Sequence, residues 1–204
     1  ASSAAPIGEC EPPIHEDMAC KPKAPYGASK LAGEGYCSAY HGSFGIETVA
    51  LRFGNVYGPR SGHKSSVVAK FIRRALNGKT LEIYGDGQQT RDFIHTEDLT
   101  RAIFLAATES GVGGEIYQIA TNSETTINQL TEIIVEALME EAGLHDVEVT
   151  HTESRTGDIR RNYSDTTKAE DVLGWTPQVS LPQGLKRTVQ SFASNHHGSP
   201  KDSR

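Results

Sequence analysis

The sequence predicts an α/β fold with parallel pairing of its strands. Short apolar blocks, typical of buried strands, alternate with longer blocks in which apolar residues recur at helical spacing. Turn sequences separate the blocks, such as Asn77-Gly78 after a helical pattern and Gly85-Asp86-Gly87 after a strand pattern. This alternation of strands and helices is typical of a sheet whose strands run parallel.

The first half of the chain contains two predicted helices and three predicted strands. Residues 1–25 are expected to form a loop, because prolines are frequent there and apolar periodicity is nearly absent. A helix is expected over 26–40, where small residues such as Gly33 and Gly35 would allow close approach to another backbone. The other expected elements are strands over 48–53, 81–84 and 93–95 and a helix over 67–76.

The second half contains two further strands and four helices. Thr126 and Gln129 precede an apolar run at the spacing of a capping box, and Ser180 is a candidate N-cap for the last helix. The polar residues 194–204 are expected to form a disordered tail. The expected helices cover 99–106, 127–138, 167–173 and 181–192, and the expected strands cover 116–120 and 147–149.

Composition and charge argue against several classes of protein. The 204 residues carry 20 basic and 26 acidic side chains, and a formal net charge of −6 disfavours a nucleic-acid partner held by a broad basic surface. No apolar run approaches the roughly 18 residues that a membrane helix needs, so no membrane partner is expected. Cys10, Cys20 and Cys37 lack Cys-x-x-Cys spacing, and we interpret them as reduced thiols of a cytoplasmic protein without a metal site.

The strongest chemical signal is Tyr26-Gly27-Ala28-Ser29-Lys30. On a helix, residues four apart share a face, so the Tyr26 phenol and the Lys30 ammonium would project side by side. A cation beside a phenol favours the phenolate, which is the form that accepts a proton. Taken alone, Tyr-x-x-x-Lys is common by chance, and an ordinary surface pair is then the favoured interpretation.

Other motifs give this pair a context. Ser2-Ser3-Ala4-Ala5 precedes Tyr26 and Lys30 in the order of a Ser-Tyr-Lys triad. The ordered set resembles the NAD-dependent nucleotide-sugar epimerases and dehydratases of the extended short-chain dehydrogenase/reductase superfamily, and it is most similar to the UDP-glucose 4-epimerase type. The further motifs that carry the resemblance are Leu51-Arg52-Phe53-Gly54-Asn55-Val56-Tyr57-Gly58-Pro59-Arg60, Tyr84-Gly85-Asp86-Gly87-Gln88-Gln89-Thr90-Arg91-Asp92-Phe93-Ile94-His95, Arg155-Thr156-Gly157-Asp158, Ser164-Asp165-Thr166-Thr167-Lys168-Ala169 and Leu173-Gly174-Trp175-Thr176-Pro177.

The resemblance implies the C-terminal part of a Rossmann-type parallel sheet domain, with NAD as cofactor, and a smaller α/β domain for substrate. It implies that Ser3 hydrogen-bonds the sugar hydroxyl and that Tyr26 is the general base. Lys30 is expected to hold the nicotinamide ribose and to favour the Tyr26 phenolate, and Phe53 is expected to contact NAD. The implied partner is a nucleotide-diphosphate sugar, with a UDP-sugar preferred, and the full-length enzyme is expected to be a homodimer.

Four further residues are implied to bind the nucleotide sugar. Asn55, Arg91 and Arg155 are expected near its diphosphate, and Asp158 near the nucleotide ribose. Arginine suits this role because its planar fork donates two parallel hydrogen bonds to phosphate oxygens. Simpler readings stay open: Asn55 could cap a turn, Arg91 could pair with Asp92, and Arg155 could be a solvated loop residue.

The chain departs from the family pattern in its first part. Pyrophosphate binding in this fold uses a glycine-rich turn between a strand and a helix, and neither Gly85-Asp86-Gly87 nor Gly111-Val112-Gly113-Gly114 has that context. We therefore expect the C-terminal portion of a longer enzyme, inactive on its own. Its expected domains are a remnant of the NAD-binding domain over 1–56 and a substrate domain over 57–193, of which part of 92–122 packs back on the sheet.

Ala4 and Ala5 indicate which reaction of the family to expect. Dehydratases of the family carry an acidic pair at this place, and alanine supplies no proton. The expected reaction is therefore epimerisation of UDP-glucose and UDP-galactose at C4, through a transient 4-keto sugar. The alternatives are a dehydratase, a decarboxylase or an epimerase at another carbon, and a non-catalytic remnant that binds a nucleotide sugar.

Overall fold

A computed structural model describes residues 1–154, 157 and 159–197, and the chain in it forms two compact units. The first unit comprises 1–56, 90–124 and 159–178, and the second comprises 57–89, 125–158 and 179–204. The segment 90–124 thus belongs to the first unit. What each expected domain binds stays a prediction.

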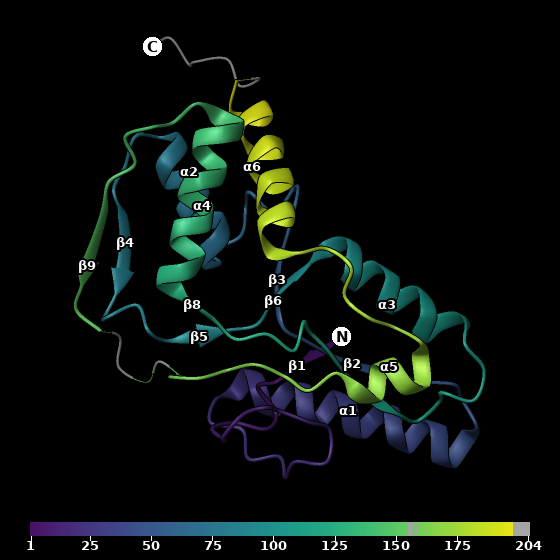
Figure 1. Cartoon of the computed structure of the whole chain (residues 1–204). Helices are drawn as coiled ribbons and strands as arrows, with labels where there is room; N and C mark the ends of the chain where they lie inside the picture. The colour runs from purple at the N-terminus through teal and green to yellow at the C-terminus, as the bar shows by residue number, and fades with distance from the viewer. Residues whose placement is uncertain (155–156, 158, 198–204) are drawn as a thin grey trace, which may run out of the picture. The chain divides into compact units, whose positions relative to one another are not determined.

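A parallel three-stranded sheet is the centre of the first unit (Figure 1). Its strands are β1 (Ser2–Ser3), β2 (Ala50–Phe53) and β7 (Ile116–Ile119), in the order β1-β2-β7. Both pairings are parallel, with Ser3 opposite Phe53 and Phe53 opposite Ile119. The prediction of an α/β fold with parallel strands is confirmed.

Helix α1 (Pro25–Phe44) is longer than the expected 26–40. Pro25 occupies the first helical turn, where its missing N–H costs nothing. The helix ends at Gly45, whose φ of 65° is in the left-handed region, and the Gly45 N–H donates to the His41 carbonyl. Phe44 is therefore the last helical residue, because the left-handed Gly45 that follows it caps the helix.

The remaining helices of the first unit are α3 (Thr96–Thr108) and α5 (Thr167–Leu173). Helix α3 starts earlier than the expected residue 99, because the His95 Nδ1 accepts the Glu97 N–H at 3.3 Å and caps it. Strand β2 begins at Ala50 and not at the expected Thr48. The chain also forms four short extended segments, β3 (Asn55–Tyr57), β5 (Thr90–Arg91), β6 (Phe93–His95) and β8 (Thr125–Thr126), of which β8 belongs to the second unit.

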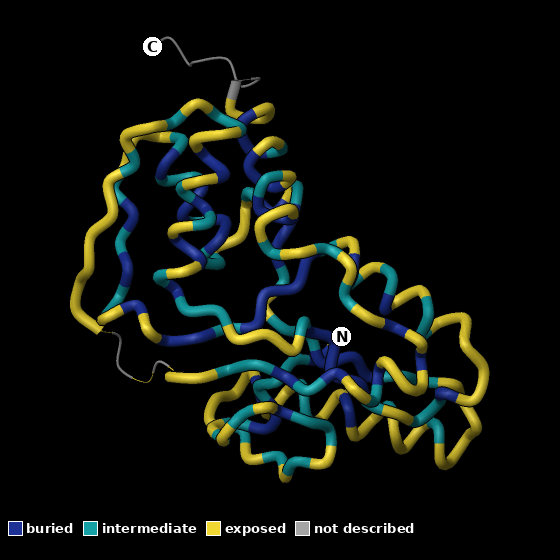
Figure 2. Tube along the Cα trace, viewed as in Figure 1, coloured by how far each residue is buried: buried dark blue, intermediate teal, exposed yellow. Residues whose placement is uncertain are grey.

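The core of the first unit lies between the sheet and helices α3 and α5. Trp175 is 1% exposed, and its indole N–H donates to the Asp98 carbonyl at 3.0 Å, which satisfies its one polar atom. Buried segments appear as dark blue stretches of the tube in Figure 2. The buried members of this core are Leu51, Ile94, Ala102, Val112, Tyr117, Ile119, Ala169, Leu173 and Trp175.

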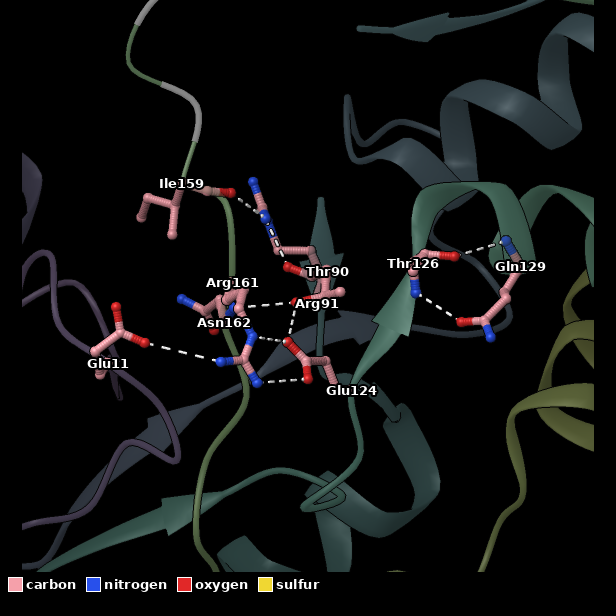
Figure 3. Close-up of polar contacts among 9 residues, drawn as sticks. All are labelled: Glu11, Thr90, Arg91, Glu124, Thr126, Gln129, Ile159, Arg161 and Asn162. Carbon is pink, nitrogen blue, oxygen red and sulfur yellow. Dashed lines mark hydrogen bonds and ion pairs between the residues drawn. The ribbon is translucent and has the colours of Figure 1, made fainter. Parts of the chain in front are cut away.

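The second unit combines three helices with a pair of parallel strands, β4 (Leu81–Tyr84) and β9 (Val149–Thr152). Its helices are α2 (Val67–Leu76), α4 (Ile127–Ala142) and α6 (Leu181–His197). The bounds of α2 and β4 agree with the sequence prediction. The Thr126–Gln129 capping box is confirmed, with reciprocal hydrogen bonds of 2.9 and 3.0 Å (Figure 3).

Three elements of the second unit differ from expectation. Helix α4 continues past the expected residue 138 to Ala142 and ends at Gly143, whose φ of 66° is in the left-handed region. Strand β9 lies later than the predicted 147–149, because its ladder runs along β4 from Leu81 opposite Val149 to Tyr84 opposite Thr152. Helix α6 continues past the expected Phe192 to His197, so residues 194–197 of the expected tail are helical, and Ala193 is still buried on its apolar face. Among the described residues, no helix is long and apolar enough to span a membrane.

Candidate active site

Ser3 and Phe53 lie opposite each other at the carboxyl ends of neighbouring parallel strands, β1 and β2. Ligands of open α/β sheets bind beyond these carboxyl ends. The Ser3 Oγ accepts the Ala5 N–H at 3.1 Å, which holds the hydroxyl in one orientation and leaves its proton available to a ligand.

Helix α1 places Tyr26 and Lys30 on one face. The Lys30 Nζ lies 5.7 Å from the centroid of the Tyr26 ring, within the range of a cation–π contact. The Lys30 Nζ also donates to the carbonyl of Ala1 at 3.0 Å, two residues before Ser3. The Tyr26 residue is 56% exposed.

The first turn of α1 also meets the chain just after Ser3. Gly27 is buried against the Ala5 carbonyl and the Pro22 side chain. Helix α1 therefore contacts the chain on both sides of Ser3, at Ala1 and at Ala5. The structure thus brings all three residues of the expected triad into one small region of the first unit.

A buried ion pair lies beneath this region. The Glu34 Oε1 accepts from the Arg52 Nε, and the Glu34 Oε2 accepts from the Arg52 Nη2, both at 2.8 Å. The two side chains are 3% and 2% exposed. Burial lowers the pKa of Arg52, but the hydrogen bonds and charge of Glu34 outweigh it, and the net pKa is raised.

Sequence reasoning did not identify this pair as part of the site. The available signal was Arg52 itself, a charged residue in the otherwise apolar run 49–53. The sequence signal at Glu34 was weaker, because Glu34 follows Lys30 by one helical turn and has the pattern of an ordinary polar residue of α1. Their pairing depends on how the helix packs on the sheet.

Asn55 begins β3 and Arg91 ends β5, and both belong to the first unit. Asn55 is exposed, and its backbone N–H donates to the Asp92 carbonyl at 2.7 Å. The Arg91 Nη1 donates to the carbonyls of Thr90 and Ile159, at 2.6 and 2.7 Å (Figure 3). Arg155 and Asp158 lie outside the described residues.

Asp92 has a structural role. Its Oδ1 accepts both the backbone N–H and the hydroxyl of Thr121, at 2.7 and 2.6 Å. Burial raises the pKa of Asp92, and the hydrogen bonds from Thr121 offset part of that rise. The carboxylate therefore joins the segment after β5 to the end of β7.

An ion pair network lies beside Arg91 in Figure 3. The Arg161 fork donates to both carboxylate oxygens of Glu124, at 2.7 and 2.9 Å, and Glu11 lies 3.8 Å away. The Glu124 Oε1 also accepts the Thr90 hydroxyl at 2.7 Å. The hydrogen bonds from Arg161 lower the pKa of Glu124.

Residues 1–120 match the family described as NAD dependent epimerase/dehydratase. The chain belongs to this family. The match covers the strand bearing Ser3, the helix bearing Tyr26 and Lys30, and the segment bearing Asn55 and Arg91. The resemblance recognised in the sequence is confirmed, and the cofactor of the family is NAD.

The chain is similar in sequence to known members of the family. It is 38% identical over 182 residues to the UDP-glucose 4-epimerase of Mycolicibacterium smegmatis, covering 88% of this chain and 56% of that protein. It is 34% identical to the dTDP-glucose 4,6-dehydratase of an Actinoplanes species, covering 85% of this chain and 52% of that protein.

The chain is also similar in fold to a solved structure. The UDP-glucose 4-epimerase of Thermotoga maritima, determined with UDP-glucose, superposes with a TM-score of 0.85 at 37% identity, covering 95% of this chain and 62% of that one. The epimerase/dehydratase chain therefore spans somewhat more than half the length of the relatives that it matches.

Proposed function

We propose that this chain carries the catalytic groups of a nucleotide-sugar 4-epimerase that interconverts UDP-glucose and UDP-galactose. The observation that carries the proposal is the Tyr26–Lys30 pair, held on α1 against the strand that bears Ser3. In this proposal Tyr26 is the general base, and Ser3 supplies a hydroxyl at the adjoining strand end.

Each residue has one step in the reaction. Ser3 donates a hydrogen bond to the C4 oxygen of the sugar and orients it toward Tyr26. The Tyr26 phenolate takes the proton of the C4 hydroxyl. It returns the proton after the transient 4-keto sugar has rotated so that the opposite face of the sugar reacts. Lys30 stabilises the phenolate through its charge. NAD, when bound, supplies the acceptor and donor of the C4 hydrogen.

The residues present fit this cofactor. Lys30 and Tyr26 offer an ammonium and a hydroxyl, which are hydrogen-bond donors suited to a ribose diol. Phe53 ends a strand beside Ser3, where an aromatic ring can lie against a flat cofactor ring. Lys30 and Tyr26 would hold the ribose, and Phe53 would contact the nicotinamide side.

The nucleotide end of the substrate is assigned to four residues. Asn55 begins β3 and Arg91 ends β5 in the first unit, and Arg155 and Asp158 lie in the motif Arg155-Thr156-Gly157-Asp158. A guanidinium binds a diphosphate through two parallel hydrogen bonds, and a carboxylate accepts from ribose hydroxyls. These groups bind and orient the substrate and take no part in proton transfer.

Ala4 and Ala5 favour epimerisation over dehydration. Removal of water from the sugar requires an acid that protonates the leaving hydroxyl. The two residues after Ser3 are alanines, and the Ala5 N–H is already directed at the Ser3 Oγ. This segment therefore offers no acidic side chain beside the sugar.

The test uses the full-length protein with NAD. UDP-galactose is supplied in one reaction and dTDP-glucose in a second, and the products are resolved by chromatography and NMR. We expect UDP-glucose in the first reaction and no 4-keto-6-deoxy sugar in the second. Dehydration without interconversion of the UDP-sugars would replace the proposal with the dehydratase reaction.

We also propose that the full-length protein is a homodimer. Helix α1 presents aromatic side chains that are well exposed in this chain: Tyr36 at 68%, Tyr40 at 49% and Phe44 at 71%. A surface of this kind is suited to association with another apolar face. Light scattering of the full-length protein gives the mass directly, and a monomer at micromolar concentration contradicts the proposal.

A further inference from the structure

A row of three buried polar residues crosses the sheet of the first unit. Ser2, Arg52 and Gln118 are Cα partners across β1, β2 and β7, and each precedes the last residue of its strand. They are 6%, 2% and 0% exposed. Partners in register direct their side chains to the same face of a sheet, so the row is one polar stripe under the strand ends.

Helix α1 contributes Glu34 to this stripe. Glu34 is 4% exposed, and its Oε1 accepts the Ser2 hydroxyl at 2.5 Å in addition to the Arg52 Nε at 2.8 Å. With the second oxygen bound to the Arg52 Nη2, the carboxylate is held by a planar fork and by a hydroxyl. One helical side chain is therefore fixed to both β1 and β2.

The position of Glu34 connects this contact to the triad. Glu34 lies one helical turn after Lys30, and Ser2 lies next to Ser3. Sliding or rotation of α1 along β1 would change the distance from Tyr26 and Lys30 to Ser3, and it would also break the three-way contact at Glu34. The contact thus opposes the motion that would separate the reacting groups.

We propose that Glu34 and Arg52 are positioning residues of the active site, which fix the register of α1 on β1 and β2. This inference rests on the proposed function of Ser3, Tyr26 and Lys30. Buried ion pairs often add little net stability relative to apolar residues, and their best attested use is to specify one register. Misplacement of a base by about 1 Å is sufficient to slow a reaction by roughly 100-fold.

The test compares two isosteric changes in the full-length protein with NAD. Glu34→Gln removes the charge that binds Arg52, and Asp98→Asn is the matched control. Asp98 lies on a different helix, α3, and is also a fully buried carboxylate. It accepts hydrogen bonds from the Arg101 Nη2 and from the Gln178 N–H, both at 2.9 Å. Both variants are assayed below their own melting temperatures.

We expect kcat of Glu34→Gln to fall by about 10- to 100-fold, with KM for UDP-galactose within about twofold of wild type. Asp98→Asn is expected to lose thermal stability and to keep its kcat. A second readout is independent of turnover: amide hydrogen exchange over residues 26–31 should accelerate in Glu34→Gln and not in Asp98→Asn. Arg52→Lys, which keeps the charge and loses the fork, should show an intermediate kcat.

The outcomes separate the two proposals. An inactive wild type, or a fully active Tyr26→Phe variant, overturns the proposed function and this inference with it. An active wild type with an inactive Tyr26→Phe variant, but unchanged kcat in Glu34→Gln, overturns the positioning role alone. Equal losses of kcat in Glu34→Gln and Asp98→Asn also overturn it, since they indicate general loosening. If Glu34→Gln fails to fold, unchanged kcat and exchange in Arg52→Lys decide against the proposal.

Discussion

Gly27 lies so close to Ala5 that a Cβ atom on Gly27 would be 2.5 Å from the Ala5 carbonyl oxygen. Backbone atoms cannot yield as a flexible side chain can, so the first turn of α1 would have to move. Ala5 follows Ser3 by two residues, and Gly27 follows Tyr26 by one. The close approach therefore sets the spacing between the proposed base and the proposed hydroxyl.

The first prediction concerns this approach. Gly27→Ala should lower the melting temperature and reduce kcat, because the helix start is displaced from the chain after Ser3. The matched control is Gly33→Ala on the same helix, where a Cβ meets nothing within 4 Å. That control should gain up to about 1 kcal/mol in stability, since alanine is the better helix former. Thermal unfolding and turnover of both variants check the prediction, and similar behaviour of the two would contradict it.

Tyr26→Phe is the second change. It keeps the ring and removes the hydroxyl, so kcat in the full-length protein should fall by about 100-fold or more while KM changes far less. Tyr36→Phe serves as control, because Tyr36 is on the same helix outside the Tyr26–Lys30 pair and the change keeps its aromatic ring. Steady-state kinetics with UDP-galactose measures both variants. A near-normal rate for the Tyr26 variant would remove this residue from the mechanism.

The third prediction addresses the anion site. Replacing Arg91 or Arg155 with Lys keeps the charge but cannot reproduce the two-pronged hydrogen bond to a diphosphate. A charge-assisted hydrogen bond contributes about 1.5–3 kcal/mol, so UDP affinity should weaken by roughly tenfold or more per change. Calorimetry with UDP measures this, with Arg101→Lys on α3 as control. Unchanged affinity in both variants would sink the assignment.

The fourth prediction is a pH dependence of stability. The pKa of Glu124 is lowered in the folded chain, chiefly by hydrogen bonds from Arg161. Glu124 therefore contributes to the stability of the fold above the ordinary glutamate pKa of about 4.3. This contribution is lost as the pH falls through the lower pKa that Glu124 has in the folded chain. Glu124→Gln should cost on the order of 1 kcal/mol at pH 7, because the pair is partly exposed, and the difference from wild type should shrink below about pH 4.

Urea unfolding at both pH values measures the Glu124 contribution. Glu11→Gln is the matched control, since the Glu11 side chain is 94% exposed and lies 3.8 Å from the same guanidinium. This control should change stability by less than about 0.5 kcal/mol at either pH. A Glu124 effect that is independent of pH would show that the carboxylate charge is not what stabilises the contact.

The sequence was sufficient where the determinants are local. Helix α2 has strong apolar periodicity and stops at Asn77-Gly78, and the capping box needs only Thr126 and Gln129, three residues apart. Tyr26 and Lys30 share a face because of helix geometry alone. Motif order then identified the family, which the match over residues 1–120 confirms.

Other features depend on tertiary contacts, and the sequence did not indicate them. Glu34 and Arg52 are separated by 18 residues and meet only because α1 packs on β2. Strand β9 follows the length of β4, although Thr150, His151 and Thr152 carry no apolar signal. The roles of Arg91, Arg155 and Asp158 stay predictions, because they concern a bound substrate.

The last prediction is that residues 1–204 alone do not bind NAD with micromolar affinity. The sequence contains no glycine-rich turn between a strand and a helix, so the backbone N–H groups that cradle a pyrophosphate are not supplied by these residues. Lys30 and Tyr26 can contact a ribose, but two side chains do not offset the entropy of capturing a whole dinucleotide. The described sheet also ends at β1, and an unpaired edge promotes association of chains.

Calorimetry with NAD and light scattering on residues 1–204 make this test, with the full-length protein as control. We expect no heat of binding from the shorter chain and a mass above that of one copy, against saturable binding by the full-length protein. A well-folded monomer of 1–204 that binds NAD at micromolar concentration would show that Ser3, Tyr26, Lys30 and Phe53 form a sufficient cofactor site without a glycine-rich turn. The pyrophosphate would then have to be held by other groups of this chain, and Arg91 and Arg155 would be the first to replace.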